Sequence, residues 1–331
     1  MAIKACVSAA LAALACLSAQ QAAAAETCPP LRWMTLGTAG GPVPTPDRSE
    51  PANLLTADDF SALVDAGDGT VVQLARRGLD LTRISAVFIS HHHMDHTGGL
   101  PAVIGLRWMN NMPGQLTIYG PPGTREIVDG IIATMGPQSR VGFGLGLGQK
   151  STPPSDSVRV VEMRSGDQVS SGNVKITAVE NSHYDESVSG KADRAISLSY
   201  RFQLGSRSIT YSGDTGPSAA FEKLATGTDL LVSEVIDLDP ILASIRKTRP
   251  DMPEAVFQSM SKHLSTHHIT PVDLGSLAAK ANVSRLVLTH FAIPPAPLTN
   301  SEARLREGIS RSYSGPVDLA IDLQSFDVAC K

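Results

Sequence analysis

The chain has 331 residues, of which 28 are lysine or arginine and 32 are aspartate or glutamate. No run of like charges appears, and the composition lacks the basic excess that nucleic-acid-binding proteins usually carry. A chain of this length suffices for one large hydrophobic core or two modest ones.

The first 25 residues are typical of a secretory signal peptide. Lys4 is the only charge before Glu26, an apolar stretch covers residues 5–17, and small residues at 22–25 offer a cleavage site. A membrane span is the weaker interpretation, because about 20 apolar residues are needed to cross a bilayer. We therefore expect residues 1–25 to be removed, the protein to be periplasmic or secreted with no membrane span, and residues 26–331 to form one domain.

Cys28 and Cys330 are the two cysteines that follow the signal peptide, one near each end of the mature chain. An exported protein meets an oxidising environment, and chain termini often lie close together. We expect a disulfide bond between them. The alternative is two unpaired cysteines in frayed tails.

Strand-like and helix-like segments alternate along the mature chain. Strands are expected at residues 31–36 and 60–64, and helices at 70–77, 99–108, 125–135 and 272–281. The glycine-rich segments are expected to be turns or loops, at residues 37–42, 65–70 and 141–148. Strands mixed with helices on this scale indicate an α/β sandwich.

Four further β-prone runs each stop at a side chain that can bind a metal ion. These runs and the residues to which they lead are 84–90 to His91, 174–180 to His183, 208–212 to Asp214 and 285–289 to His290. Ligands at strand ends can gather along one edge of a sheet. Rigid strands then hold them with the small positional tolerance that a metal site needs.

The strongest motif is the H-x-H-x-D-H arrangement of His91, His93, Asp95 and His96. Residues two apart in an extended segment point the same way, so the first two histidines can bind one ion, and the turn that follows can present Asp95 and His96 to a second. Imidazole and carboxylate ligands suit Zn²⁺. A chance histidine-rich tract is the alternative, but it would not explain the apolar strand before the motif or the two glycines after it.

With these features the sequence resembles the metallo-β-lactamase superfamily over essentially the whole mature chain. The resemblance implies an α/β fold, the αββα four-layer sandwich, with a site for two Zn²⁺ ions per chain. It assigns three histidines to the first ion, an aspartate and two histidines to the second, and a further aspartate to both. In this sequence these are His91, His93 and His183, then Asp95, His96 and His290, and finally the bridging Asp214.

Within the superfamily, the chain looks closest to the branch that holds ribonuclease Z and the zinc arylsulfatases and phosphodiesterases. Segments 36–38 and 65–70 are similar to early motifs of that branch. In such proteins the position of Asp65 supports a metal-bound histidine. Taken from the sequence alone, Asp65 is equally well interpreted as a turn carboxylate.

His268 resembles the extra histidine of this branch, which lies across from the metals and is paired with a glutamate. Glu234, at the end of the strand-like residues 229–233, matches that glutamate. The next residues, Thr270 and Pro271, are expected to cap and open a helix. The adjacent His267 is the main alternative to His268, and His263 is expected to lie at the surface.

The resemblance implies a metal-dependent hydrolase that acts on ester bonds. Zinc lowers the pKa of a water that attacks a phosphorus, sulfur or carbonyl centre. Asp95 holds that water and accepts its proton, and His268, oriented by Glu234, donates to the leaving oxygen. The expected function is therefore that of an exported dinuclear zinc hydrolase of small sulfate or phosphate esters. Trp108 and Phe143 are expected either to line an aromatic leaving group or to be ordinary packing residues.

Three alternatives stay open. The same kind of site can hydrolyse a β-lactam or a lactone. A ribonuclease Z-type endonuclease is disfavoured, and nucleic acid is not the expected partner, because residues 142–156 contain Lys150 as their single base. A non-enzymatic zinc-binding scaffold is least favoured, since none of the seven ligands is missing. A homo-oligomer is left open.

Overall fold

The structure is a computed structural model that describes residues 28–141, 152–184 and 194–331. The predicted signal peptide, the position of Phe143 and most of the glycine-rich segment 141–148 lie outside the described residues. Among those that are described, no helix is long and apolar enough to cross a membrane.

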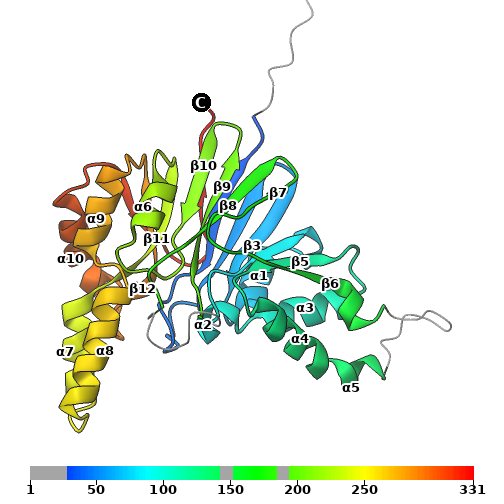
Figure 1. Cartoon of the computed structure of the whole chain (residues 1–331), viewed down its shortest axis with the longest axis horizontal. Helices are drawn as coiled ribbons and strands as arrows, with labels where there is room; N and C mark the ends of the chain where they lie inside the picture. Colours follow the sequence, from blue (N-terminus) through cyan, green and yellow to red (C-terminus); the bar gives the residue numbers. More distant parts are fainter. Residues whose placement is uncertain (1–27, 142–151, 185–193) are drawn as a thin grey trace, which may run out of the picture.

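Two mixed β-sheets form the centre of the described chain (Figure 1). The first has the spatial order β14 (Gln324–Asp327), β1 (Leu31–Gly37), β2 (Ala52–Ala57), β3 (Phe60–Ala66), β4 (Ala86–Phe88), β5 (Leu116–Gly120) and β6 (Val158–Glu162). The second has the order β13 (Val317–Leu319), β12 (Leu286–Ala292), β11 (Leu230–Ile236), β10 (Arg207–Tyr211), β9 (Leu198–Leu204), β8 (Val174–Glu180) and β7 (Gln168–Ser171).

Each sheet is antiparallel in one half and parallel in the other. Strands β3 to β6 pair in parallel in the first sheet, and β10 to β13 do so in the second. Parallel strands need crossover connections, which place helices on the outer faces of both sheets. The central strands are therefore covered on both sides, and β3, β10 and β11 are almost entirely buried.

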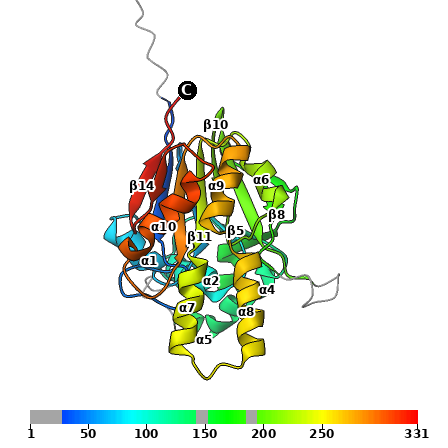
Figure 2. The ribbon, with the colours of Figure 1, turned by 90° about the vertical axis from the view of Figure 1, so that its left-hand side faces the viewer.

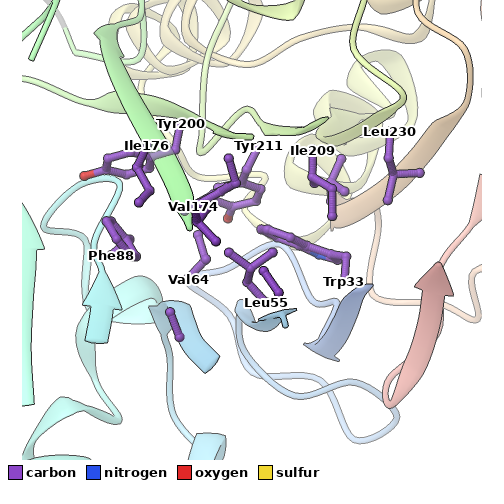
Figure 3. Close-up of a cluster of buried hydrophobic side chains, with 14 of the residues drawn as sticks. Trp33, Leu55, Val64, Phe88, Val174, Ile176, Tyr200, Ile209, Tyr211 and Leu230 are labelled. Carbon is purple, nitrogen blue, oxygen red and sulfur yellow. The ribbon is translucent and has the colours of Figure 1, made fainter. Parts of the chain in front are cut away.

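The main core lies between the two sheets and is rich in aromatic side chains (Figure 3). Trp33 of β1 packs against Tyr211 of β10 with ring centroids 5.4 Å apart. Phe88 of β4 meets Phe202 of β9 edge-on at 5.3 Å. Such pairs join the sheets by burying large apolar surfaces in a favourable geometry.

Two further apolar clusters fix helices to the outer faces of the sheets. The first sheet is covered by α1 (Thr70–Arg76), α3 (Leu100–Met109) and α4 (Thr124–Thr134). The second is covered by α6 (Ala219–Ala225), α9 (Pro271–Lys280) and α10 (Thr299–Ser310). The layers run helix, sheet, sheet, helix, which confirms the predicted αββα four-layer sandwich.

Short helical segments connect these layers. They are α2 (Met94–Thr97), α5 (Gly136–Ser139) and two 3₁₀ turns at Leu81–Arg83 and Pro154–Ser157. As predicted, α9 opens at Pro271 behind an N-cap threonine, and the hydroxyl of Thr270 accepts a hydrogen bond from the Asp273 N–H.

A helical hairpin that we did not predict projects from the second sheet. Figure 2 shows α7 (Leu238–Thr248) and α8 (Glu254–His267) side by side, extending beyond the sheets. None of the residues of α7 is buried. Near the tip, Arg246 forms an ion pair with Glu254 and lies 3.5 Å above the Phe257 ring.

The ends of the described chain lie together. A disulfide joins Cys28 to Cys330, with their Cα atoms 6.3 Å apart, as predicted. Beside it, β1 pairs with β14, and Arg32 forms an ion pair with Asp327.

Candidate metal centre

The ligand candidates meet at one edge of the two sheets because of strand direction. β4 and β3 run parallel and lead toward His91 and Asp65 at the same end. In the second sheet, β8 and β10 are both antiparallel to β9, so both end at the same edge, next to His183 and Asp214. Ligands commonly bind beyond the carboxyl ends of strands in such sheets.

Two strands, β4 and β12, end at residues other than those predicted from the sequence. Each difference affects the position of a candidate ligand. β4 stops at Phe88 because the Ser90 N–H donates to the Asp65 carboxylate instead of to a neighbouring strand. β12 continues past His290, but two of its residues lie opposite one of β11 at this point. Such a bulge redirects side chains, and His290 adopts a positive φ of 42° there.

Four side chains form the first ligand group: His91, His93, His183 and Asp214, with their ligand atoms within 4.8 Å of one another. The Nε2 atom of His91 lies 3.1 Å from Nδ1 of His93, and the Nε2 atom of His183 lies 3.2 Å from the same nitrogen. The ring nitrogens therefore converge on a common point.

Asp95, His96 and His290 form the second group, under the same 4.8 Å limit. The Oδ2 atom of Asp95 lies 3.5 Å from Nε2 of His96 and 3.6 Å from Nε2 of His290. Asp95 and His96 come from the one-turn helix α2, which directly follows His93.

Asp214 lies between the two groups. Its Oδ1 atom is 3.2 Å from Nε2 of both His96 and His290. Its Oδ2 atom is 3.8 Å from Nε2 of His91 and 3.9 Å from Nε2 of His183. Each carboxylate oxygen thus faces a different ligand group, which is the arrangement that a bridging ligand needs.

Unsatisfied polar atoms indicate what belongs between these side chains. The Nε2 atoms of His96 and His290 and the Oδ1 atom of Asp214 are buried and have no hydrogen-bond partner. Buried polar atoms without partners are rare in folded proteins and point to a missing ion or water. Imidazole and carboxylate groups in this number fit two divalent metal ions.

Comparison with known proteins places the chain in a family. A family model described as a β-lactamase superfamily domain matches residues 61–291. The chain belongs to the metallo-β-lactamase superfamily.

Relatives and solved structures agree with this family assignment. The chain is 29% identical over 297 residues to a protein named ribonuclease Z from Mycolicibacterium paratuberculosis, covering 88% of this chain and 96% of the relative. The metallo-β-lactamase fold protein YhfI from Bacillus subtilis superposes with a TM-score of 0.64 at 20% identity, over 90% of this chain and all of that one. The short form of human tRNase Z gives 0.60 at 23%, with the same coverage. The protein is a hydrolase of this superfamily, near its ribonuclease Z branch.

Asp65 supports the second ligand group of this superfamily member. It accepts hydrogen bonds from Ser90 and from the Tyr211 hydroxyl at 2.8 Å, and it lies 2.8 Å from Nδ1 of His96. This contact turns the other nitrogen of His96 toward Asp214. The structure therefore places Asp65 against a candidate ligand and not in an isolated turn.

His268 and Glu234 lie together beside the ligand groups. The Nδ1 atom of His268 is 2.7 Å from Oε2 of Glu234, whose other oxygen accepts a hydrogen bond from the Thr215 N–H. The alternative, His267, has a different partner: its backbone carbonyl lies 2.9 Å from Nδ1 of His183. The geometry thus pairs His268, and not its neighbour, with the glutamate.

The local electrostatics suit metal ligands. Burial lowers the pKa of His91 well below its usual range and that of His183 to about 3, so both rings are neutral. Burial alone would raise the pKa of Asp95, but His96 and His290 outweigh it and lower the value to about 2. Neutral imidazoles and ionised carboxylates are the forms that bind metal.

The second group carries a field that favours positive charge. Burial lowers the pKa of His96, but Asp214, Asp65 and Asp95 outweigh it and raise the pKa well above the usual range. At His290, burial likewise lowers the pKa and Asp214 raises it, and the net effect is a raised pKa. This negative field would stabilise a cation at the same place.

The sequence does not identify one residue of the site, Tyr184, and predicts that another, His263, lies at the surface. Tyr184 accepts a hydrogen bond from the His92 N–H, and its ring lies 5.3 Å from that of His93. His263 is not a plain surface residue, because it lines the cavity beside the metal centre. Trp108 packs in the core under α3. Neither Tyr184 nor His263 carries a sequence signal, since each reaches the site through tertiary packing.

Proposed function

We propose that this hydrolase binds two zinc ions and cleaves phosphate or sulfate esters of small molecules, phosphodiesters above all. The supporting observation is the position of the His268–Glu234 pair. His268 lines the same cavity as Asp95 and Asp214, so a proton donor and both ligand groups can reach one bound ester. His91, His93 and His183 would hold one ion and Asp95, His96 and His290 the other, with Asp214 shared between them.

When bound, the two ions supply a water of lowered pKa and positive charge against the ester oxygens. The chain itself supplies proton transfer. Asp95, with its pKa lowered to about 2, is an ionised acceptor. Burial lowers the pKa of His268, but Glu234 outweighs burial and raises it to about 9, so His268 carries a proton at neutral pH and can donate it to the leaving oxygen.

We further propose that the protein works outside the cytoplasm. The signal-like residues 1–25 support this location, as does the disulfide between Cys28 and Cys330, because such bonds persist mainly in oxidising compartments.

Nucleic acid is the second candidate substrate. It follows from the relatives named ribonuclease Z, of which the chain covers 96%, and it is in tension with our expectation of a small substrate. Against it, the helical hairpin that projects beyond the sheets, residues 238–267, is close to neutral, with four lysines and arginines and three acidic residues. A surface that binds a polyanion is expected to be strongly basic.

One panel of assays tests this proposal, using protein of measured metal content. The substrates are a bis-aryl phosphodiester, an aryl sulfate, a cephalosporin, a homoserine lactone and a precursor tRNA. We expect the phosphodiester to give the highest kcat/KM. A dominant rate on the cephalosporin or lactone would instead make the protein a β-lactamase or lactonase, and one on tRNA a nuclease. No turnover on any substrate would favour a metal-binding scaffold.

A further inference from the structure

A cavity of about 660 Å³ opens beside the metal centre. His93, Asp95, Asp214 and His268 line one part of it, so the cavity is continuous with the candidate catalytic groups. Pockets of this volume hold drug-sized ligands. A small headgroup alone would leave most of this space empty.

One wall of the cavity is the helical hairpin. On α7, Ile241, Ser244, Ile245 and Thr248 line the cavity, and their spacing of i, i+3, i+4 and i+7 places them on one helix face. Met260 and Leu264 of α8 line it as well. A helix face with apolar residues at this spacing normally packs on a core. None of the residues of α7 is buried, and the face borders the cavity instead.

The part of the cavity rim outside the hairpin also carries apolar side chains. Val43 and Met94 line the cavity and are 66% and 76% exposed. Met94 stands between the candidate ligands His93 and Asp95, so apolar surface reaches the metal centre itself. Large exposed apolar surfaces around a pocket mark binding sites for apolar groups.

Arg48 is the one lysine or arginine among the described residues that line the cavity. Its side chain is 7% exposed, and one terminal nitrogen bonds to Asp47. A guanidinium that lines the cavity can pair with an anionic oxygen of a ligand.

From these observations we infer that the substrate is an amphiphile: a phosphate or sulfate ester carrying an extended apolar chain or ring system. The apolar part lies between α7–α8 and the rim of Val43 and Met94, and the anionic part lies toward Arg48 and the metal centre. This inference rests on the proposed ester hydrolysis, but the apolar pocket can be tested apart from it.

A series of alkyl 4-nitrophenyl phosphates tests the pocket in the metal-loaded enzyme. In each, water adds to phosphorus and the bond to the nitrophenol oxygen breaks, giving the alkyl phosphate, nitrophenolate and two protons. The leaving group is constant, so only the methyl, butyl or octyl chain varies. Each methylene that leaves water should raise kcat/KM about three- to fourfold. If about half of the added methylenes are buried, octyl exceeds methyl by about a hundredfold.

Variants of the hairpin localise the effect. The double substitution Ile241→Ser and Ile245→Ser should lower the octyl-to-methyl ratio of kcat/KM about tenfold or more, because the loss grows with the length of the chain that contacts these residues. The matched control is Val256→Ser, because Val256 is 52% exposed on the same hairpin and is not among the lining residues. An equal ratio in the wild type and the double variant would overturn the inference.

Binding of uncleavable alkylphosphonates separates the two proposals. Calorimetry should show octylphosphonate binding about a hundredfold more tightly than methylphosphonate, with the difference reduced in the double variant. If octylphosphonate binds more tightly but no ester is cleaved, the proposed function fails and the apolar pocket stands. If the methyl ester is cleaved but chain length changes neither rate nor affinity, the function stands and the amphiphile inference fails.

Discussion

Single carboxylates decide how the histidines of this hydrolase are oriented. Asp65 touches Ser90, Tyr211 and His96 at 2.7–2.8 Å, and Glu234 does the same for His268. Because both acids are fully buried, each holds its imidazole in one orientation. Such outer contacts fix the orientation of metal-bound histidines and thereby raise metal affinity.

Asp65→Asn tests this role. The amide keeps the size of the side chain but lacks the charge that stabilises the imidazole, so we expect zinc affinity to fall about 10- to 100-fold. A competitive chelator titration measures it. Asp59→Asn is the matched control, since Asp59 is exposed in the turn between β2 and β3, and it should bind zinc as the wild type does. Equal zinc affinity in the two variants would show that Asp65 does not support the metal site.

His268→Ala tests the proton donor. We expect kcat on a phosphodiester to fall about 10²- to 10⁴-fold. Zinc content should not change, because His268 is paired with Glu234 and lies outside the two ligand groups defined above, although its ring also clusters with Glu234 and Asp214. Metal analysis and steady-state kinetics are the measurements. Loss of zinc would show a structural effect, and unchanged kcat would exclude the donor role.

The pH dependence of kcat provides a second test of the role of His268. Its pKa is raised to about 9 from an ordinary value near 6.5, with Glu234 outweighing burial. The folded state therefore binds the proton of His268 more tightly than the unfolded state does. The stability that this gives is fully present below about pH 6.5 and is lost as the pH rises through about 9. Wild-type kcat should fall on this alkaline limb, and the limb should be absent from the residual activity of His268→Ala.

At the scale of elements, turns after strands place the ligands. Gly213 lies between β10 and Asp214 with φ at +58°, and a Cβ built on it would lie 2.8 Å from Cβ of Ser90. Only glycine adopts this conformation freely and admits such a close approach. The turn thereby holds Asp214 between the two ligand groups.

Gly213→Ala should destabilise the fold by about 1–3 kcal/mol and lower zinc stoichiometry. Gly205→Ala is the control, because Gly205 has φ at +59° in the turn between β9 and β10 but no atom within 4 Å of its added Cβ. Urea unfolding and metal analysis of both variants separate backbone strain from crowding. Identical behaviour of the two would mean that the contact with Ser90 is unimportant.

At the scale of the whole molecule, the disulfide joins the ends of the described chain across a sequence separation of 302 residues. A bond that closes so long a loop restricts the unfolded chain strongly. It also sits beside the pair of β1 with β14, where fraying would begin.

Replacing Cys28 and Cys330 together by serine should lower the free energy of unfolding by about 2–5 kcal/mol. Urea denaturation of oxidised wild type, reduced wild type and the double variant measures this loss. Reduced wild type should match the double variant. If a reducing agent does not change the midpoint of the wild type, the disulfide contributes no stability.

Much of this protein follows from sequence alone, because its signals are local. The two-residue spacing of His91 and His93, the strands before each ligand and the glycine turns depend on short-range geometry. They indicated an α/β sandwich with a metal site, and the resemblance to the superfamily implied its four layers. The Thr270 cap is local in the same way. By contrast, β4 ended early and β12 continued past His290 because hydrogen bonds to distant segments, and not propensity, set those boundaries.

Only the tertiary structure decided where the ligands meet and what lies beside them. Nothing local shows that the two oxygens of Asp214 face different histidine groups, or that His263 and Arg48 line the cavity beside them. The apolar face of α7 could equally have covered a core. Its position beside the catalytic groups comes from long-range pairing of β11 with β12, which carries the hairpin to this edge of the sheet.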